Sequence, residues 1–103
     1  MKTKPYITTD SSNTITAISA NLIGTLHTDN TIDAKGICWN TGGFPTVTDD
    51  ISYQLGTEGT FQIKATLLGY QNQTYYYRAF LSGYVDGALS NTTYGDQLSF
   101  TTP

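Results

Sequence analysis

The stretch Gln73–Leu81, QTYYYRAFL in one-letter code, is the strongest indication of a central β-strand in this chain. It is rich in aromatic residues and contains neither Gly nor Pro, which favours a β-strand because aromatic side chains suit a pleated, half-buried surface. Successive side chains of a strand point to opposite faces. We expect the core face to carry the odd-numbered positions Tyr75, Tyr77, Ala79 and Leu81. The other face then carries Tyr76, Arg78 and Phe80.

The rest of the chain divides into short extended runs separated by turn-forming residues. A run at 6–9 is predicted to stop at the turn-forming cluster Asp10–Asn13, and a loop is predicted at Gly83–Asn91. Alternation between apolar and polar residues predicts core-facing side chains at Ala20, Leu22, Gly24 and Leu26, and at Phe61, Ile63, Ala65 and Leu67. Further extended runs are predicted at 14–18, 34–39, 51–55 and 97–102. No stretch has the apolar periodicity of an amphipathic helix.

Short strands at intervals of about 8–12 residues predict an all-β fold, a single antiparallel Greek-key β-sandwich of about seven strands. A length of 103 residues fits one domain. We expect residues 1–13 to form an N-terminal extended segment, either a linker or an exchanged strand, and residues 14–103 to form the sandwich. The run 34–39 is apolar on both faces, so the sequence leaves open which face Trp39 takes.

Composition narrows the classes of function. Charged residues make up 13% of the chain, against about 25% in ordinary globular proteins, and hydroxyl and amide side chains supply most of the polarity. A net charge of −3 with five scattered Lys and Arg argues against binding to nucleic acid or to anionic membranes. No apolar run approaches the ~20 residues of a membrane-spanning helix. The expected location, extracellular or at the cell surface, rests on this composition because no secretory signal follows Met1–Pro5.

The residues that catalysis or metal binding would need are scarce. The single histidine, His27, lies in a polar, turn-like stretch, and the single cysteine, Cys38, lies beside Trp39 in an apolar run. No nucleophile and base can be paired from these residues, and a zinc site needs more Cys and His ligands. We therefore predict no enzymatic activity, no metal site and no cofactor. Cys38 is expected to be a buried small hydrophobic residue.

Several segments occur in an order that points to a known family. In one-letter code they are GICWNT at 36–41, PT at 45–46, TYYYRAF at 74–80, YGD at 94–96 and LSFTT at 98–102. This series resembles the fibronectin type III-like repeats of bacterial surface and secreted proteins, which carry GxCWST, TYYVRAY and YGxxxSFTT in the same order. The resemblance covers residues 14–102 and implies a fibronectin type III/immunoglobulin-like sandwich. It leaves function open, because such domains serve as spacers, adhesins and assembly units.

The resemblance also implies one hydrogen bond and marks two departures. By analogy with the tyrosine corner of such sandwiches, the Tyr75 hydroxyl is expected to bond towards the backbone of Leu68–Gly69. The segment 68–72 lacks the Leu-x-Pro of the family, and Gly83–Asn91 is longer and more apolar than the family's loop. A longer apolar loop is a candidate contact surface.

Surface aromatic residues and sequons are the remaining candidates for sites. A sandwich core about 10 Å thick cannot hold every aromatic side chain of this sequence. We predict a candidate contact surface that includes Tyr76, Tyr84, Val85 and Leu89, although scattered surface aromatics explain these residues equally well. The triplets at Asn72 and Asn91 are candidate N-glycosylation sites, each expected at a junction between a loop and a strand.

These observations lead to a main hypothesis and two alternatives. In the main hypothesis the chain is a non-enzymatic structural module of a head-to-tail surface array or filament, and it associates with identical or tandem domains. The Thr-rich strand Tyr6–Thr9 is the candidate for exchange with a neighbour's sheet edge. The alternatives are a carbohydrate- or protein-binding accessory or adhesion domain, with glycans as partners, and a phage virion decoration domain.

Overall fold

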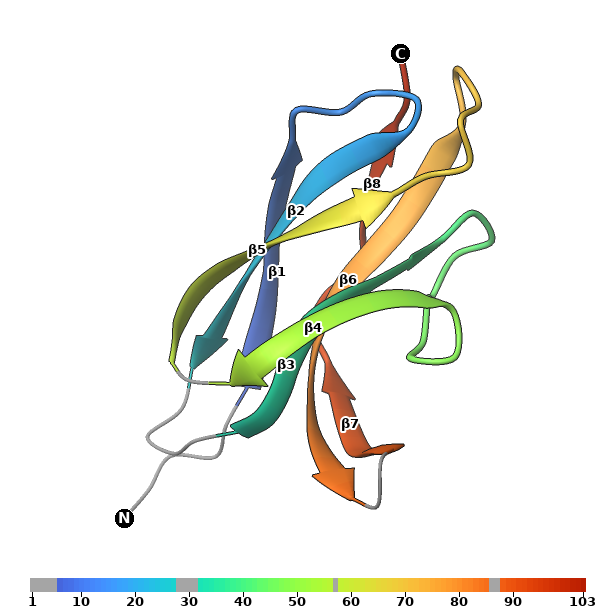
Figure 1. The fold of residues 1–103 in the computed structure, drawn as a ribbon. Helices are drawn as coiled ribbons and strands as arrows, with labels where there is room; N and C mark the ends of the chain where they lie inside the picture. The colour runs from blue at the N-terminus through green and yellow to red at the C-terminus, as the bar shows by residue number, and fades with distance from the viewer. Residues whose placement is uncertain (1–5, 28–31, 57, 86–87) are drawn as a thin grey trace.

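The computed structural model describes residues 6–27, 32–56, 58–85 and 88–103, and every regular element in these ranges is a strand. The eight strands are β1 (Tyr6–Asn13), β2 (Ser19–His27), β3 (Ile32–Asn40), β4 (Asp50–Gly56), β5 (Gly59–Thr66), β6 (Thr74–Val85), β7 (Ala88–Tyr94) and β8 (Leu98–Thr101). Figure 1 shows the strands running obliquely along an elongated molecule.

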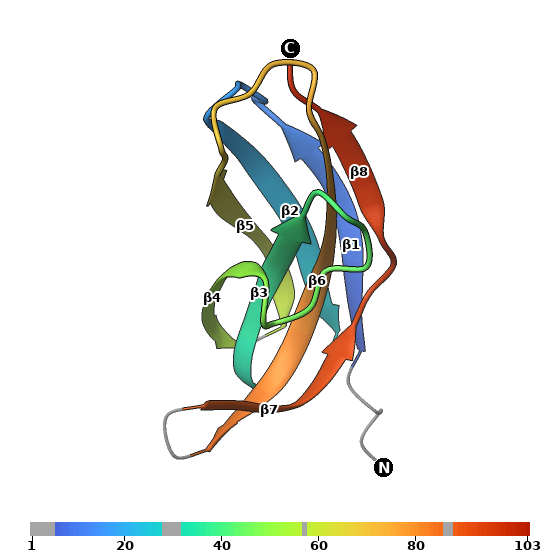
Figure 2. The same ribbon diagram turned by 90° about the vertical axis from the view of Figure 1, so that its right-hand side faces the viewer.

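The strands form two antiparallel sheets that pack face to face. One sheet has the order β1-β2-β5, and the other has the order β4-β3-β6-β7, with β8 also paired to β6. Strands β7 and β8 follow each other along the same side of β6, with a break between Tyr94 and Leu98 (Figure 2). This break divides the last strand in two. The predicted antiparallel β-sandwich is confirmed.

The core lies between the sheets and is built from alternate positions of their strands. In β2 and β5 the predicted core-facing residues are buried. In β6 the predicted core face is confirmed, because Tyr75, Tyr77, Ala79 and Leu81 are all buried. Phe100 of β8 stacks on Tyr75 with ring centroids 5.4 Å apart. Trp39, whose face the sequence left open, belongs to this core cluster.

The outer face of the larger sheet is buried as well at its centre. Phe80 has no exposed surface, although it points away from the core between the sheets. Its neighbours across the sheet are Gly36 on β3 and Tyr94 on β7. Cys38 lies on the same outer face and is also fully buried, as the sequence predicted. The Cys38 thiol donates to the Pro45 carbonyl oxygen (3.4 Å), so the loop between β3 and β4 covers this face.

Two predicted turns are strands in the structure. The cluster Asp10–Asn13 continues β1 as far as Asn13, with a register shift between Thr9 and Ser11. This bulge is held by Asp10, whose carboxylate accepts hydrogen bonds from the Thr8 and Thr25 hydroxyls. The turn therefore falls later, at residues 14–18, where an extended run was predicted. The predicted loop at Gly83–Asn91 is also wrong, because β6 and β7 pair as far as Val85 and Ala88.

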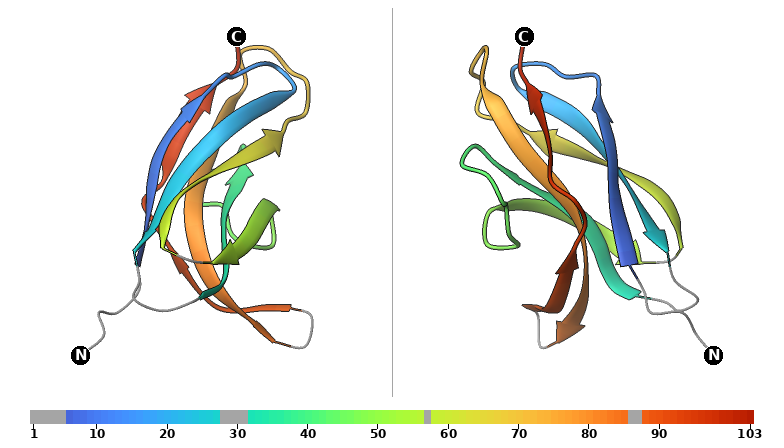
Figure 3. Two further views of the ribbon diagram at one scale, coloured as in Figure 1. Left: turned by 60° about the vertical axis from the view of Figure 1, so that its left-hand side comes forward. Right: turned by 180° about the vertical axis from the view of Figure 1, so that it is seen from behind.

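Residues 6–13, proposed from the sequence as a linker or exchanged strand, pair with β2 of the same chain. The far edge of β1 approaches the bend between β7 and β8 (Figure 3). A side chain at Gly95 would lie 2.9 Å from the Ile7 carbonyl oxygen, so only glycine fits there. The Ala79 backbone N–H donates to the Thr9 hydroxyl at 2.8 Å and joins the two sheets at this point. The strand Tyr6–Thr9 is therefore engaged on both sides within the chain.

The close approach of β3 and β4 at Gly36 gives a prediction. A Cβ at this position would lie 2.3 Å from the Ser52 carbonyl oxygen. We expect Gly36→Ala to lower the free energy of unfolding by about 2 kcal/mol, since overpacking forces backbone shifts. Urea denaturation measures this change. Gly42→Ala is the control, because nothing lies within 4 Å of its Cβ position. Equal stabilities of the two variants would contradict the packing described here.

Candidate functional site

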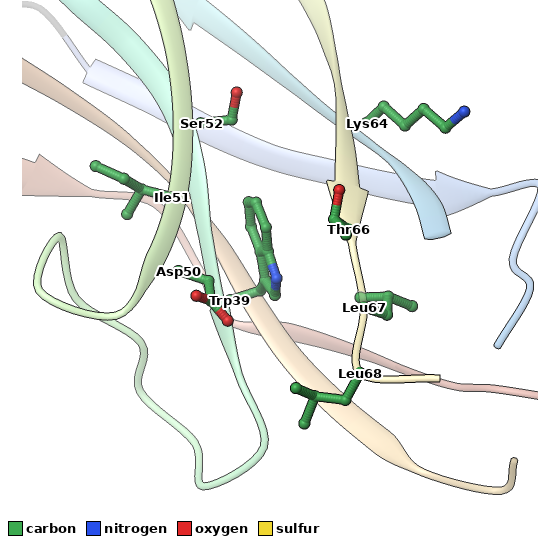
Figure 4. Close-up of a pocket in the computed structure, with 8 residues that line it drawn as sticks. All are labelled: Trp39, Asp50, Ile51, Ser52, Lys64, Thr66, Leu67 and Leu68. Carbon is green, nitrogen blue, oxygen red and sulfur yellow. The ribbon is translucent and has the colours of Figure 1, made fainter. Parts of the chain in front are cut away.

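A groove opens on the side of the sandwich where β4 and β5 are the outermost strands of their sheets. Its volume is about 460 Å³, within the range of small-molecule and peptide pockets. Figure 4 shows the residues that line it: Trp39, Asp50, Ile51, Ser52, Lys64, Thr66, Leu67 and Leu68. Apolar side chains, two hydroxyls and the Asp50 carboxylate thus surround one opening, and the Lys64 side chain extends away from Trp39 at its margin (Figure 4).

Trp39 forms the inner wall of this groove. Its side chain is only 5% exposed, and Figure 4 shows the indole nitrogen on the side of the ring that faces Leu67 and Leu68. Within the described residues the indole N–H has no hydrogen-bond partner. A buried polar group without a partner costs about 1–3 kcal/mol. Because this nitrogen has almost no accessible surface, an acceptor in the groove reaches it only when the neighbouring side chains move.

A second surface lies at the end of the sandwich near Pro103. Three large apolar side chains are turned to solvent there: Ile18 is 66% exposed, Leu68 65% and Tyr70 61%. We call these three residues the end plate. Ile18 lies in the turn between β1 and β2, and the other two lie between β5 and β6. Sequence reasoning missed this surface because its two segments are far apart in the chain.

The end plate is tied to the core by a tyrosine. The backbone N–H of Leu68 donates to the Tyr75 hydroxyl oxygen at 3.0 Å. This contact confirms the hydrogen bond expected between Tyr75 and the Leu68–Gly69 segment. The Tyr75 ring lies in the core, so this hydrogen bond attaches the loop that carries Leu68 to the core.

A polar clamp occupies the outer face of the larger sheet. The Arg78 guanidinium lies 3.9 Å from the centroid of the Tyr94 ring and donates through Nε to the Pro45 carbonyl oxygen at 2.6 Å. The Tyr94 hydroxyl oxygen accepts from the backbone N–H of Val47 (3.1 Å). These contacts hold the loop between β3 and β4 over Cys38. Burial raises the pKa of the Cys38 thiol from 9.0 to about 11, although the nearby Arg78 charge opposes the shift.

The predicted contact surface is not one patch. Tyr76 lies opposite Asn40 and Ser99 near the start of β6, and its side chain is half-buried. Tyr84 pairs with Leu89, and Val85 follows Tyr84, at the far end of β6. Eight residues of strand separate Tyr76 from Tyr84, about 26 Å. The side chains of Tyr84, Val85 and Leu89 lie outside the described residues.

The two sequon asparagines are exposed, and both adopt a left-handed backbone conformation with φ of 53°. Asn72 lies in the turn that precedes β6, as expected. Asn91 lies inside β7 rather than at its end. At Asn91 the register between β7 and β6 shifts, between Leu81 and Gly83 of β6. The expected position of Asn91 at the junction of a loop and a strand is therefore wrong, because a β-bulge accommodates it within the strand.

The histidine and the candidate exchange strand meet at the other end of the sandwich. The Tyr6 ring stacks on the His27 ring with centroids 4.4 Å apart and an angle of 10° between the planes. Tyr6 is 49% exposed. In the described residues no group of three or more His, Cys, Asp and Glu is placed to hold a metal ion. The same residues include no helix with the length and hydrophobicity of a membrane span.

The buried thiol gives a second prediction. Because burial raises the pKa of Cys38 to about 11, its stabilising contribution is complete below about pH 9 and is lost as the pH rises through about 11. We expect the free energy of unfolding to fall by on the order of 2 kcal/mol over this interval. Burial also raises the pKa of Tyr77, so this side chain contributes a loss of stability at high pH with the same sign. Urea denaturation across the interval measures the loss, which Cys38→Ala should reduce.

Thiol labelling gives an independent check on the burial of Cys38. A disulfide reagent near neutral pH should modify Cys38 only in the unfolded protein. If labelling proceeds at the same rate in the native and the urea-unfolded protein, the thiol is not buried as described.

Comparison of the chain with protein-family models, with curated proteins and with solved structures finds no match. The resemblance to fibronectin type III-like repeats therefore rests on the sequence motifs alone.

Proposed function

We propose that this chain is a non-enzymatic structural module, located outside the cell or at its surface, and that it forms one unit of a head-to-tail array or filament. The observation that carries the proposal is the position of the chain ends. Strand β1 begins near one end of the molecule, and Pro103 lies at the other (Figures 1 and 2). The molecule measures 47 × 25 × 19 Å. Copies joined through these ends extend in line, as open head-to-tail assemblies require.

Two further features support this proposal. The two-sheet fold is compatible with the fibronectin type III-like repeats that the motifs resemble, and members of that family serve as spacers and assembly units. The low content of charged residues, 13%, suits an extracellular β-protein. Thr102 at the chain exit is almost fully buried, so a following segment leaves the sandwich in a defined direction.

A tandem protein tests the arrangement. Two full copies are joined directly, Pro103 to Met1, and their maximum dimension in solution is measured by small-angle X-ray scattering. We expect a value close to twice the 47 Å long axis of one copy. The same two copies joined by a long Gly/Ser linker are the control, and this fusion should sample more compact shapes. A direct fusion as compact as the flexible control would count against the head-to-tail arrangement.

The groove favours a second candidate function, a carbohydrate- or protein-binding module. Its lining combines the Trp39 ring and other apolar surface with the hydroxyls of Ser52 and Thr66 and the carboxylate of Asp50. Such a mixture suits a ligand that presents both hydroxyl or carbonyl oxygens and apolar faces, as oligosaccharides do.

Trp39 is the single tryptophan of the chain, so its fluorescence reports on this groove. A glycan array identifies candidate ligands, and each positive glycan is then titrated while Trp39 emission is recorded. We expect a saturable change that Thr66→Arg weakens about tenfold or more, because the new side chain fills the groove. Gln62→Arg is the matched control on the same exposed face of β5, outside the groove lining. An array without positive glycans, or equal binding by both variants, would reject an oligosaccharide ligand in this groove.

A further inference from the structure

The end plate lies on a part of the surface that has no charged side chains nearby in sequence. Residues 11–28 contain no Asp, Glu, Lys or Arg, and neither do residues 65–77. These two stretches supply both loops at this end, 14–18 and 67–73. Interface cores are depleted in charged residues and enriched in Tyr. The two loops of this end therefore have the composition of a contact surface, and the charged side chains near Leu68, those of Asp50 and Lys64, belong to the groove beside it.

The fold does not need these apolar side chains for its own core. Leu67 already points inward and is buried, whereas the adjacent Leu68 is turned out. The two loops are joined by backbone hydrogen bonds, from the Leu67 N–H to the Ile18 carbonyl oxygen (2.8 Å) and from the Gly69 N–H to the Ala17 carbonyl oxygen (3.0 Å). Together with the Tyr75 hydroxyl beneath Leu68, these bonds hold the end plate in one arrangement before any partner binds.

The chain leaves the sandwich beside the end plate. The Thr102 hydroxyl donates to the Tyr70 carbonyl oxygen at 2.6 Å. The Thr102 backbone N–H donates to the Gln73 carbonyl oxygen (2.9 Å), and its carbonyl oxygen accepts from the Asn72 N–H (3.0 Å). The C-terminal exit is thus fastened to the same loop that carries Leu68 and Tyr70.

The opposite end offers a complementary aromatic surface. Tyr6 and His27 form a stacked pair with nearly parallel rings where β1 begins and β2 ends, and half of Tyr6 is exposed. We propose that the end plate of one copy docks on the Tyr6–His27 pair of the next copy. This inference rests on the proposed head-to-tail arrangement and names the two surfaces that meet in it.

The size of the end plate determines how strong the contact is. Three side chains form a surface well below the roughly 800 Å² per partner of a stable interface between free proteins. Free copies therefore associate weakly, at high concentration. Copies in one array are held at a high effective concentration, where a weak contact suffices to set their orientation.

Concentration-dependent nuclear magnetic resonance tests the contact in the full chain. Between micromolar and millimolar protein, we expect backbone amide shifts confined to 14–18, 67–73, Tyr6 and His27. Leu68→Asp should weaken self-association about tenfold or more, because it replaces the apolar side chain that packs on the Tyr6–His27 rings with a hydrated carboxylate. Phe44→Asp is the control, since Phe44 is a 71% exposed aromatic residue between β3 and β4. Circular dichroism verifies that each variant is folded.

Mixing two variants tests the pairing of unlike ends. A Leu68→Asp protein keeps its Tyr6–His27 pair, and a Tyr6→Ser protein keeps its end plate. Each alone should show no concentration-dependent shifts, whereas a millimolar mixture should restore shifts at the end plate of the Tyr6→Ser protein. If the Tyr6→Ser protein alone still associates through its end plate, two plates meet each other and the proposed pairing is overturned.

The tandem protein separates this inference from the function on which it rests. One outcome is an extended fusion with no chemical-shift changes in the free chain at millimolar concentration. That result overturns the end plate as the interface but is consistent with the head-to-tail arrangement. A fusion as compact as the flexible control overturns the arrangement, and the end-plate contact with it.

Discussion

The structure depends on the pairing of β6 along both of its edges. This strand has twelve residues, and it pairs with β3 on one side and with β7 and then β8 on the other. Buried backbone N–H and C=O groups must find partners. At the break between β7 and β8, the Ala79 N–H bonds instead to the Thr9 hydroxyl. Ala79 of β6 therefore marks two positions: the break between β7 and β8, and the point where β1 of the other sheet contacts β6.

Strand β6, like its neighbour β3, is buried on both faces at its centre. Its inner face packs Tyr75 and Tyr77 against Phe100. On its outer face Phe80 is fully buried between Gly36 and Tyr94, and Arg78 holds the loop that covers Cys38. The neighbouring strand β4 approaches β3 too closely for a side chain at position 36, which explains the glycine there. The thiol is consequently an element of packing, with its pKa raised by burial.

Both candidate surfaces follow from the same framework. The groove lies where the outermost strands β4 and β5 of the two sheets leave Trp39 between them. The end plate is positioned through the Tyr75 hydroxyl, which reaches from the core to the backbone of Leu68. Leu68 contributes to both surfaces. A partner bound at one surface would therefore lie close to the other.

The fold class and the inner faces of β2, β5 and β6 could be predicted from the sequence, because strand alternation is a local pattern of period two. The resemblance to a family added the bond of Tyr75 to Leu68. A loop was predicted at 83–91, but the sequence also contains a signal for a hairpin there, because Asp-Gly, found at 86–87, is a frequent hairpin turn sequence. Four features could be seen only in the folded molecule: the burial of Phe80, the continuation of β1 past Asp10, the position of Trp39 and the end plate. Each of these depends on which distant segments the packed sheets bring together, and local periodicity carries no information about such contacts.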